Sequence, residues 1–188
     1  MSDKHLPLPT ERDLFSAKQV EQSTIEELSR KIIEINNDDE KLKKIYDIYG
    51  FEYRPKPIKI YIDSYGGEIY SCLGLISIIE NSKTAIHTIV TGTAMSCGFM
   101  ILISGHKRFA HKNSTVMYHQ ASTGFWGKIK DMKEDYDETK RLQSVLESIV
   151  LEKTKIKKED LKKVYNRKKD WYIDSKTALK LKVVDETI

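Results

Sequence analysis

The chain has 188 residues, which is enough for one domain with a buried core and too few to argue for two. Hydrophobic residues make up 39% and charged residues 32% of the sequence, which suits a soluble globular protein. The net charge of +4 is small, and the lysines of the C-terminal third are mixed with acidic residues such as Glu159 and Asp160. We interpret these lysines as solvated helix faces, and no nucleic-acid partner is expected.

The cysteines and the N-terminal residues indicate the compartment. Cys72 and Cys97 are the two cysteines, and their spacing fits neither a disulfide framework nor a set of metal ligands. The first ten residues are polar and are broken by Pro7 and Pro9, unlike a signal peptide, and no apolar run approaches the length of a membrane span. We therefore expect a cytoplasmic protein with no membrane role.

The first half of the chain alternates between strand and helix patterns. A weak strand is expected over 13–17, and apolar residues at helical spacing predict a helix over 25–35. Residues 36–57 are charged and aromatic and end in proline, so we expect a separate surface helix and a loop there. Alternating isoleucines predict a strand over 58–62, and the spacing over 73–79 predicts the next helix.

The second half continues this alternation. A buried strand over 85–90 precedes a buried helix over 99–103, two short strands over 107–111 and 115–119, and a long amphipathic helix over 129–153. The remaining elements are a lysine-rich helix, an apolar segment at 171–173, a last helix opening near 174 or 175, and a terminal apolar pair at 183–184. Strands that alternate with helices predict an α/β fold with a mainly parallel sheet.

The most informative stretch is a run of small residues over 91–98 (TGTAMSCG) between two apolar segments. It places Ser96 at the first turn of a buried helix, directly after a strand. A serine there has its hydroxyl on a rigid elbow, and the N–H groups at the helix start can stabilise an oxyanion. This arrangement suits a nucleophile, although the G-x-S-x-G elbow sequence is absent. Taken alone, small residues at a strand-helix turn more often serve only close packing.

Two further features lie near strand ends. Gly66 and Gly67 follow the strand over 58–62, where glycine lets a backbone N–H approach a reacting oxygen. His119 closes the strand over 115–119 and is a candidate general base. A tight turn and an ordinary surface or core histidine are open alternatives. The three features support one another only if the fold brings them together.

Three ordered segments carry a family resemblance: 61–67 (YIDSYGG), 92–96 (GTAMS) and 116–120 (VMYHQ). They resemble the Y-I-N-S-P-G-G turn, the G-x-A-x-S nucleophile motif and the V-M-I-H-Q histidine motif of ClpP, the Clp protease proteolytic subunit. The match runs from about Glu11 to Asp185. It implies one domain over 1–188 with the ββα spiral that ClpP shares with crotonases, and a protruding strand-helix handle at about 120–153.

The resemblance implies a Ser-His-Asp serine peptidase that needs no metal or organic cofactor. Ser96 would attack a peptide carbonyl, His119 would carry its proton to the leaving amine, and Asp170 would orient the imidazole. The backbone N–H groups of Gly67 and Cys97 would stabilise the tetrahedral oxyanion.

The carboxylate of this triad has two competitors. Alignment backward from Val184 and Asp185 places the family's aspartate at Asp170. Asp63 stands where the family has asparagine, and Asp174 is typical of a helix cap.

The resemblance also bears on substrate and assembly. The long helix matches the family's handle, which interlocks two rings, so we expect a homo-oligomer, as a heptameric ring or a stacked double ring. Tyr61 matches a position lining the family's docking pocket for ATPase loops, and the short segment over 1–10 predicts a weakened interaction with a Clp-type ATPase. The strand that aligns an extended substrate matches Gly124, Phe125, Trp126 and Gly127.

Two departures from the family pattern stand out. Lys182 replaces the glycine after the last helix, which predicts a strained helix end. Residues 37–57 form an insertion for which a contact surface and a small satellite core are equally good interpretations. Its aromatic residues are Tyr46, Tyr49, Phe51 and Tyr53.

The sequence thus predicts a serine endopeptidase that cleaves unfolded polypeptides or short peptides inside an oligomeric chamber. One alternative is a non-catalytic ring subunit or scaffold with the same fold. The other is a crotonase-type acyl-CoA enzyme, which shares the spiral and the paired oxyanion donors but does not need serine, histidine and aspartate in this order.

Overall fold

The computed structural model describes residues 11–122, 124 and 128–188. Its strands are β1 (Asp13–Ser16), β2 (Ile58–Ser64), β3 (Ile86–Met95), β4 (Lys107–Ala110), β5 (Thr115–Tyr118), β6 (Trp171–Asp174) and β7 (Glu186–Thr187). Its helices are α1 (Gln22–Ile48), α2 (Ile69–Glu80), α3 (Cys97–Ile103), α4 (Ile129–Lys153), α5 (Lys158–Arg167) and α6 (Ser175–Lys180). No helix in these ranges has both the length and the apolar character needed to cross a membrane.

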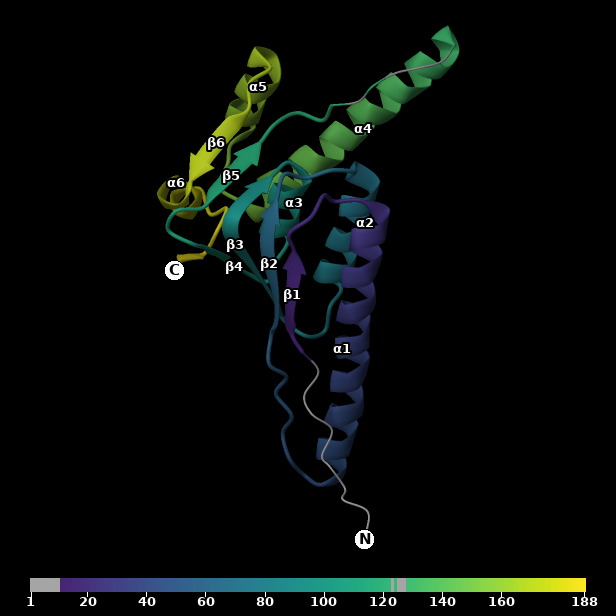
Figure 1. Ribbon diagram of the computed structural model, residues 1–188, viewed down its shortest axis with the longest axis vertical. Coiled ribbons are helices and arrows are strands. Elements are labelled where there is room, and N and C mark those ends of the chain that lie inside the picture. Colours follow the sequence, from purple (N-terminus) through teal and green to yellow (C-terminus); the bar gives the residue numbers. More distant parts are fainter. Residues whose placement is uncertain (1–10, 123, 125–127) are drawn as a thin grey trace.

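The predicted α/β fold with a mainly parallel sheet is confirmed. The sheet has the strand order β1-β2-β3-β4-β7, and all neighbours in this order are parallel (Figure 1). β5 also pairs with β3 in parallel, and β6 is antiparallel to β5. The alternating isoleucines of β2 form the centre of the core, because Ile58, Ile60 and Ile62 have no exposed surface. Burying each one contributes about 1.5–3 kcal/mol to folding.

The strand predicted over 85–90 is longer than expected, because β3 continues to Met95. Its last residues are small because they lie between two other strands: Ala94 pairs with Ser64 of β2 on one side and Val116 of β5 on the other. Ser96 therefore lies at the junction of β3 and α3 as the helix N-cap, and not inside the first turn.

The prediction of two separate helices between residues 25 and 49 is wrong, since α1 is one helix of 27 residues. Asn36 does not interrupt it, because its side chain is occupied by neighbours. Its Nδ2 donates to the carbonyl oxygen of Ile32 at 2.8 Å, and its Oδ1 accepts from the backbone N–H of Lys83 at 2.8 Å and of Thr84 at 3.1 Å. The tertiary contact of Asn36 thus lets α1 continue where the local sequence predicts a break.

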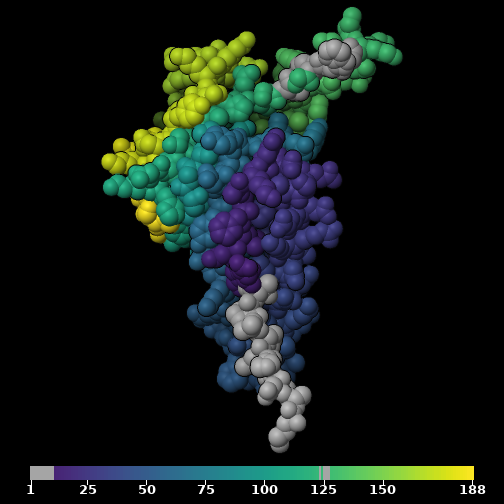
Figure 2. All heavy atoms as spheres, viewed as in Figure 1, coloured from purple at the N-terminus to yellow at the C-terminus, as the bar shows by residue number. Residues whose placement is uncertain are grey.

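Two parts of the molecule project from the sheet (Figures 1 and 2). The handle helix predicted over 129–153 is confirmed as α4, which extends away from the sheet at one end. At the other end, the second half of α1 and the loop that leads to β2 extend beyond the sheet. The strand predicted for the handle falls largely on 125–127, which lie outside the described residues.

The projecting end of α1 is tied to the sheet through one buried carboxylate. Asp39 accepts hydrogen bonds from both terminal nitrogens of Arg12 at 2.5 and 2.9 Å, from Tyr53 Oη at 2.6 Å and from Thr84 Oγ1 at 2.5 Å. Burial by itself would raise the pKa of Asp39, but the hydrogen bonds from Arg12, Thr84 and Tyr53 outweigh it and lower the pKa. Asp39 therefore stays ionised and joins α1, β1 and the insertion.

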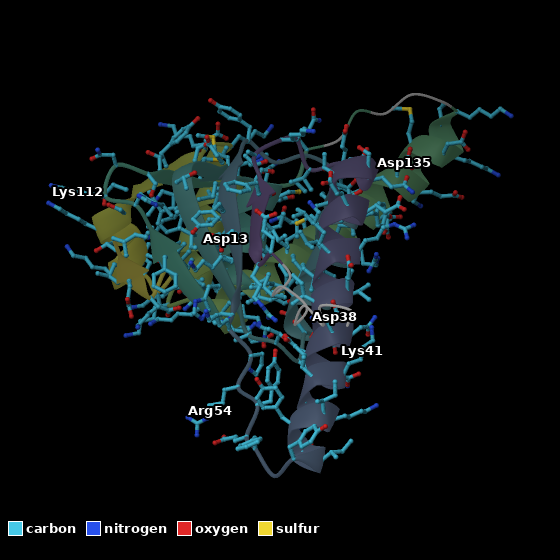
Figure 3. All side chains as sticks on the ribbon, turned by 60° about the horizontal axis from the view of Figure 1, so that its bottom comes forward. Asp13, Asp38, Lys41, Arg54, Lys112 and Asp135 are labelled. Carbon is cyan, nitrogen blue, oxygen red and sulfur yellow. The ribbon has the colours of Figure 1, made fainter. Side chains whose placement is uncertain are left out.

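The insertion combines features of both interpretations. The rings of Tyr46 and Tyr53 pack 5.1 Å apart as a small cluster against α1. Tyr49 and Phe51 are 72% and 67% exposed, so its tip presents apolar surface. The insertion also carries charged side chains; Figure 3 labels Asp38 and Lys41 along α1 and Arg54 on the loop.

The C-terminal segment differs in detail from the prediction. Val183 and Val184 are fully buried, but the terminal strand, β7, begins two residues later. The strained helix end predicted at Lys182 is present, with a φ of +55°. The turn is held by the backbone N–H of Val183, which donates to the carbonyl oxygen of Ala178 at 2.9 Å.

Replacing Asp39 by asparagine is expected to lower the free energy of unfolding by about 2–4 kcal/mol, because it leaves Arg12 buried without a countercharge. Urea denaturation at neutral pH measures this. Since folding lowers the pKa of Asp39, its contribution is complete above the ordinary value of about 3.9 and is lost as the pH falls toward the native value. The difference between wild type and variant should therefore shrink below about pH 4.

The matched control is Asp47→Asn, which neutralises an exposed aspartate on the same helix and should change stability by less than about 0.5 kcal/mol. Equal effects of the two substitutions would contradict the role of Asp39.

Replacing Lys182 by glycine should raise the free energy of unfolding by about 0.5–1 kcal/mol, because glycine adopts a positive φ without strain. Thermal or urea denaturation measures the change. Lys180→Gly, at the last residue of α6, is the control and should destabilise by up to about 1 kcal/mol. If both variants lose stability, Lys182 is not strained.

Candidate active site

Ser96 occupies a strained turn between β3 and α3. Its φ of +53° and ψ of −119° lie in a region that residues other than glycine rarely adopt, at a cost of about 1–3 kcal/mol. The backbone N–H of Ser96 donates to the carbonyl oxygen of Met117 at 2.9 Å, which fixes the turn against β5. Strained strand-to-helix turns of this kind expose nucleophilic serines in hydrolases. The elbow is thus present although its usual sequence signature is not.

The turn at Gly66 and Gly67 lies directly against Ser96. Gly66 has a φ of +102°, and a Cβ added there would be 2.7 Å from Ser96 Cβ and 2.8 Å from the carbonyl oxygen of Met95. A Cβ on Gly67 would overlap the carbonyl group of Val20. The turn is held by the N–H of Val20, which donates to the Gly66 carbonyl oxygen at 2.8 Å. Only glycine fits either position, so the pair is more than an ordinary tight turn.

Two backbone N–H groups beside Ser96 are available to an incoming oxygen. Cys97 is the first residue of α3, and the first N–H groups of a helix have no acceptor within it. Among the residues that the structure describes, the N–H of Gly67 donates to no backbone acceptor in a turn or loop. The Cys97 thiol donates to the Gly67 carbonyl oxygen at 3.2 Å and so orients that peptide group. Sequence patterns did not reveal this role of the thiol.

Cys72 supports Cys97 from α2. Its thiol donates to the Cys97 carbonyl oxygen at 3.5 Å, and both cysteines are free and buried. The neighbouring Cys97 thiol and burial raise the pKa of Cys72, so it remains a neutral thiol. The two cysteines act as small packing and positioning groups.

A cavity of about 50 Å³ brings four of the predicted site residues together: Ser96, His119, Gly67 and Cys97. Larger hollows lie elsewhere, one of about 430 Å³ between β1 and α1 and one of about 530 Å³ outside the turn over 63–67. The small cavity is the one that contains a nucleophile, a base and free N–H groups. Its other lining residues are Ile69, Met100, Tyr118, Gln120, Ala121, Ser122 and Leu146.

His119 and Asp170 lie at the ends of paired strands. Tyr118, the last residue of β5, pairs with Trp171, the first residue of β6. His119 and Asp170 are the next residues along the chain, one step beyond the last pair of this antiparallel register. Within the described residues no direct hydrogen bond or ion pair joins Ser96, His119 and Asp170, and Asp170 is exposed beside a second cavity, of about 230 Å³, lined also by residues of α5.

The competing carboxylates have other partners. Asp63 Oδ1 accepts from the backbone N–H of Thr93 at 2.9 Å and lines the hollow outside the turn instead of the cavity of Ser96. Asp174 Oδ1 accepts from the backbone N–H of Thr177 at 2.7 Å, which confirms its prediction as a helix cap. Thr177 lowers the pKa of Asp174.

A buried polar network beside the cavity was not predicted. Gln143 of α4 donates from Nε2 to Tyr118 Oη at 3.2 Å and to Glu147 at 2.8 Å, and its Oε1 accepts from the N–H of Ala121 at 2.7 Å. The sequence did carry a signal, because Tyr118 replaces the isoleucine of the V-M-I-H-Q motif.

Of the four residues predicted for the substrate strand, the structure describes one. Gly124 is exposed, with open space around its Cα, whereas Phe125, Trp126 and Gly127 lie outside the described residues. Across the described ranges, no three histidine, cysteine, aspartate or glutamate side chains are close enough to hold a metal ion.

A family model described as Clp protease matches residues 6–188 of this chain. A relative from Deinococcus radiodurans, an ATP-dependent Clp protease proteolytic subunit, is 33% identical over 133 residues. That alignment covers 70% of this chain and 64% of the relative, so the chain spans less than two thirds of the relative's length.

Two further relatives bear similar names. The ATP-dependent Clp protease proteolytic subunit 2 of Treponema pallidum is 28% identical over 135 residues, covering 71% of this chain and 67% of the relative. The ATP-dependent Clp protease proteolytic subunit 1 of Prochlorococcus marinus is 28% identical over 185 residues, covering 97% of this chain and 86% of the relative.

Replacing Gly66 by alanine should lower the free energy of unfolding by about 2–4 kcal/mol, since the new Cβ meets Ser96 and backbone atoms at a positive φ. Gly74→Ala is the control, because Gly74 lies exposed in α2 with nothing within 4 Å. It should raise stability by about 0.5–1 kcal/mol. Denaturation midpoints of both variants measure the two changes in stability. A Gly66→Ala protein as stable as Gly74→Ala would contradict the close contact between Gly66 and Ser96.

Proposed function

This chain belongs to the Clp protease family, and on that basis we propose that it is a serine endopeptidase acting on unfolded polypeptides or short peptides. The observation that carries the proposal is the strained Ser96 in one cavity with His119 and the N–H groups of Gly67 and Cys97. A nucleophile, a base and an oxyanion site are the parts that acyl transfer needs.

In the proposed mechanism, His119 takes the proton of Ser96 Oγ as that oxygen attacks the peptide carbonyl, and then gives it to the leaving amine. The N–H groups of Gly67 and Cys97 stabilise the tetrahedral oxyanion, each contributing about 3 kcal/mol to transition-state binding. Water then attacks the acyl-enzyme with His119 again acting as base.

We assign the third role to Asp170. Opposite residues of an antiparallel pair have Cβ atoms about 4.5–5.5 Å apart, so one more pair beyond Tyr118 and Trp171 would bring the Asp170 carboxylate within reach of the His119 imidazole. The two side chains are not hydrogen-bonded to each other in the isolated chain, so we propose that they come into contact in the assembled protein. Asp63 and Asp174 are both held by backbone N–H groups elsewhere.

Assembly into a ring or a stacked double ring agrees with the surface of α4. Its free end exposes Ile129, Met132 and Tyr136, which share one face of the helix at spacings of three and four residues. The relatives are named proteolytic subunits, which also supports a multi-subunit enzyme. We propose that this face pairs with a second copy of the chain in the cytoplasm.

The word ATP-dependent in the relatives' names supports an ATPase partner as well. Phe15 and Tyr61 stack with ring centroids 5.2 Å apart, and Phe15 is 66% exposed beside the cavity between β1 and α1. We propose this aromatic surface as the docking point of a Clp-type ATPase.

A fluorophosphonate probe tests the proposed chemistry, because it reacts only with an activated serine. The assembled wild-type protein should be labelled at Ser96, and peptide hydrolysis should fall at least about 10²-fold in His119→Ala and in Asp170→Asn. Mass spectrometry locates the label, and fluorogenic peptides measure the rate. Circular dichroism checks that each variant is folded.

The matched control is Asp63→Asn, which restores the residue of the family motif and keeps an acceptor for Thr93. It should retain labelling and hydrolysis. Loss of activity in Asp63→Asn but not in Asp170→Asn would transfer the third role to Asp63. An assembled protein that no fluorophosphonate labels would instead be a non-catalytic subunit.

A further inference from the structure

The cavity beside Ser96 has polar groups with unused hydrogen-bonding capacity in its lining. Tyr118 is 4% exposed and packs its ring edge against Phe99, with centroids 5.7 Å apart. Its hydroxyl accepts a hydrogen bond from Gln143 Nε2. Burial raises the pKa of Tyr118 to about 12, so the hydroxyl keeps its proton. In the described part of the chain no acceptor receives that proton.

The amide of Gln143 cannot turn over to take this proton. Its Nε2 donates to both Tyr118 and Glu147, and its Oε1 accepts from the N–H of Ala121. The contacts with Glu147 and with Ala121 would both be lost if its nitrogen and oxygen exchanged places. The network thus fixes Tyr118 as a hydrogen-bond donor on the side away from Gln143.

Gln120 supplies a second unpaired group. It lines the same cavity, and its Oε1 is buried without a donor among the described residues. Buried amide oxygens in native proteins nearly always have a partner. An unpaired acceptor next to a reactive serine points to a donor that arrives with the substrate.

The size of the cavity limits what can enter. Its volume is about 50 Å³, whereas a protein cavity that takes up a benzene ring measures about 150 Å³. Aromatic side chains are therefore too large for it. Ile69, Met100 and Leu146 give the cavity apolar walls, and Tyr118 lines it beside them.

Building on the proposed peptidase function, we propose that this cavity receives the side chain of the residue that precedes the scissile bond, and that Tyr118 and Gln120 make it select serine and threonine. Ser96 and the two free N–H groups hold the scissile carbonyl. The substrate residue that contributes this carbonyl therefore has its side chain nearest the cavity. A short hydroxyl donates to Gln120 Oε1 and accepts from Tyr118. Valine has the shape of threonine but leaves both groups unpaired, and leucine and phenylalanine are too long.

Fluorogenic peptides that differ only in the residue before the scissile bond test the proposal. For the assembled wild-type protein, kcat/KM should be about tenfold higher with threonine than with valine, as expected for a site that desolvates polar groups for a hydroxyl. Leucine and phenylalanine peptides should be cleaved more slowly than the serine peptide.

Three variants separate size from polarity. Tyr118→Phe removes only the hydroxyl and Gln120→Leu only the polar end, so each should lower the ratio of threonine to valine toward one. Tyr118→Ile also enlarges the cavity, and it should raise kcat/KM for the leucine peptide about tenfold relative to wild type. Tyr165→Ile, an exposed tyrosine on α5, is the control and should leave every ratio unchanged.

Fluorophosphonate labelling of Ser96 in each protein distinguishes failure of the proposed selectivity from failure of the proposed peptidase function. Labelled wild-type protein that cleaves threonine and valine peptides equally, or prefers leucine, overturns the selectivity and leaves the peptidase function intact. Tyr118→Phe and Gln120→Leu proteins that are labelled but keep the wild-type ratio also overturn it. Absence of labelling in the assembled wild type overturns both proposals.

Discussion

The site depends on a contact in which the turn at Gly66 and Gly67 touches Ser96 and Cys97 without intervening side chains. A single Cβ on Gly66 would come within 3.0 Å of Ser96 Cβ, Met95 O and Cys97 N. This approach places the Gly67 peptide beside the start of α3, where the Cys97 thiol holds its carbonyl oxygen. The free N–H of Gly67 then lies beside the serine. The strained turn at Ser96 and the glycine turn depend on each other, because each packs directly against the other.

The register of the sheet explains why residues far apart in the chain gather at this point. β2, β3 and β5 are mutually parallel, so their carboxyl ends, which lead to Gly67, Ser96 and His119, lie at one edge of the sheet. β6 runs antiparallel to β5, so its beginning and not its end lies at that edge. Asp170 precedes β6 and is brought there for this reason. β6 is the one antiparallel strand among these four. If it were parallel, Asp170 would lie at the opposite edge of the sheet.

Local sequence predicted the elements whose pattern matches their final environment, such as the isoleucines of β2 and the amphipathic α4. It failed where distant residues decide the outcome. The continuity of α1 at Asn36 depends on backbone groups at 83–84, and the length of β3 depends on strands on both of its sides. In the site, small residues and motif resemblance indicated Ser96. They gave no indication of the Cys97 thiol contact, which joins residues 30 apart in the chain, and only Tyr118 in place of the motif's isoleucine pointed to the Gln143 network.

The two halves of the proposed machinery have different physical origins. The oxyanion side consists of backbone groups fixed by β2, β3, the first turn of α3 and the glycine contact, so it persists as long as the sheet is folded. His119 and Asp170 are side chains at strand ends. His119 leads toward α4 and Asp170 follows α5, and both helices stand out from the sheet (Figure 1). In the assembly proposed above, subunit contacts at α4 would bear on these side chains rather than on the backbone donors at the ends of β2 and β3.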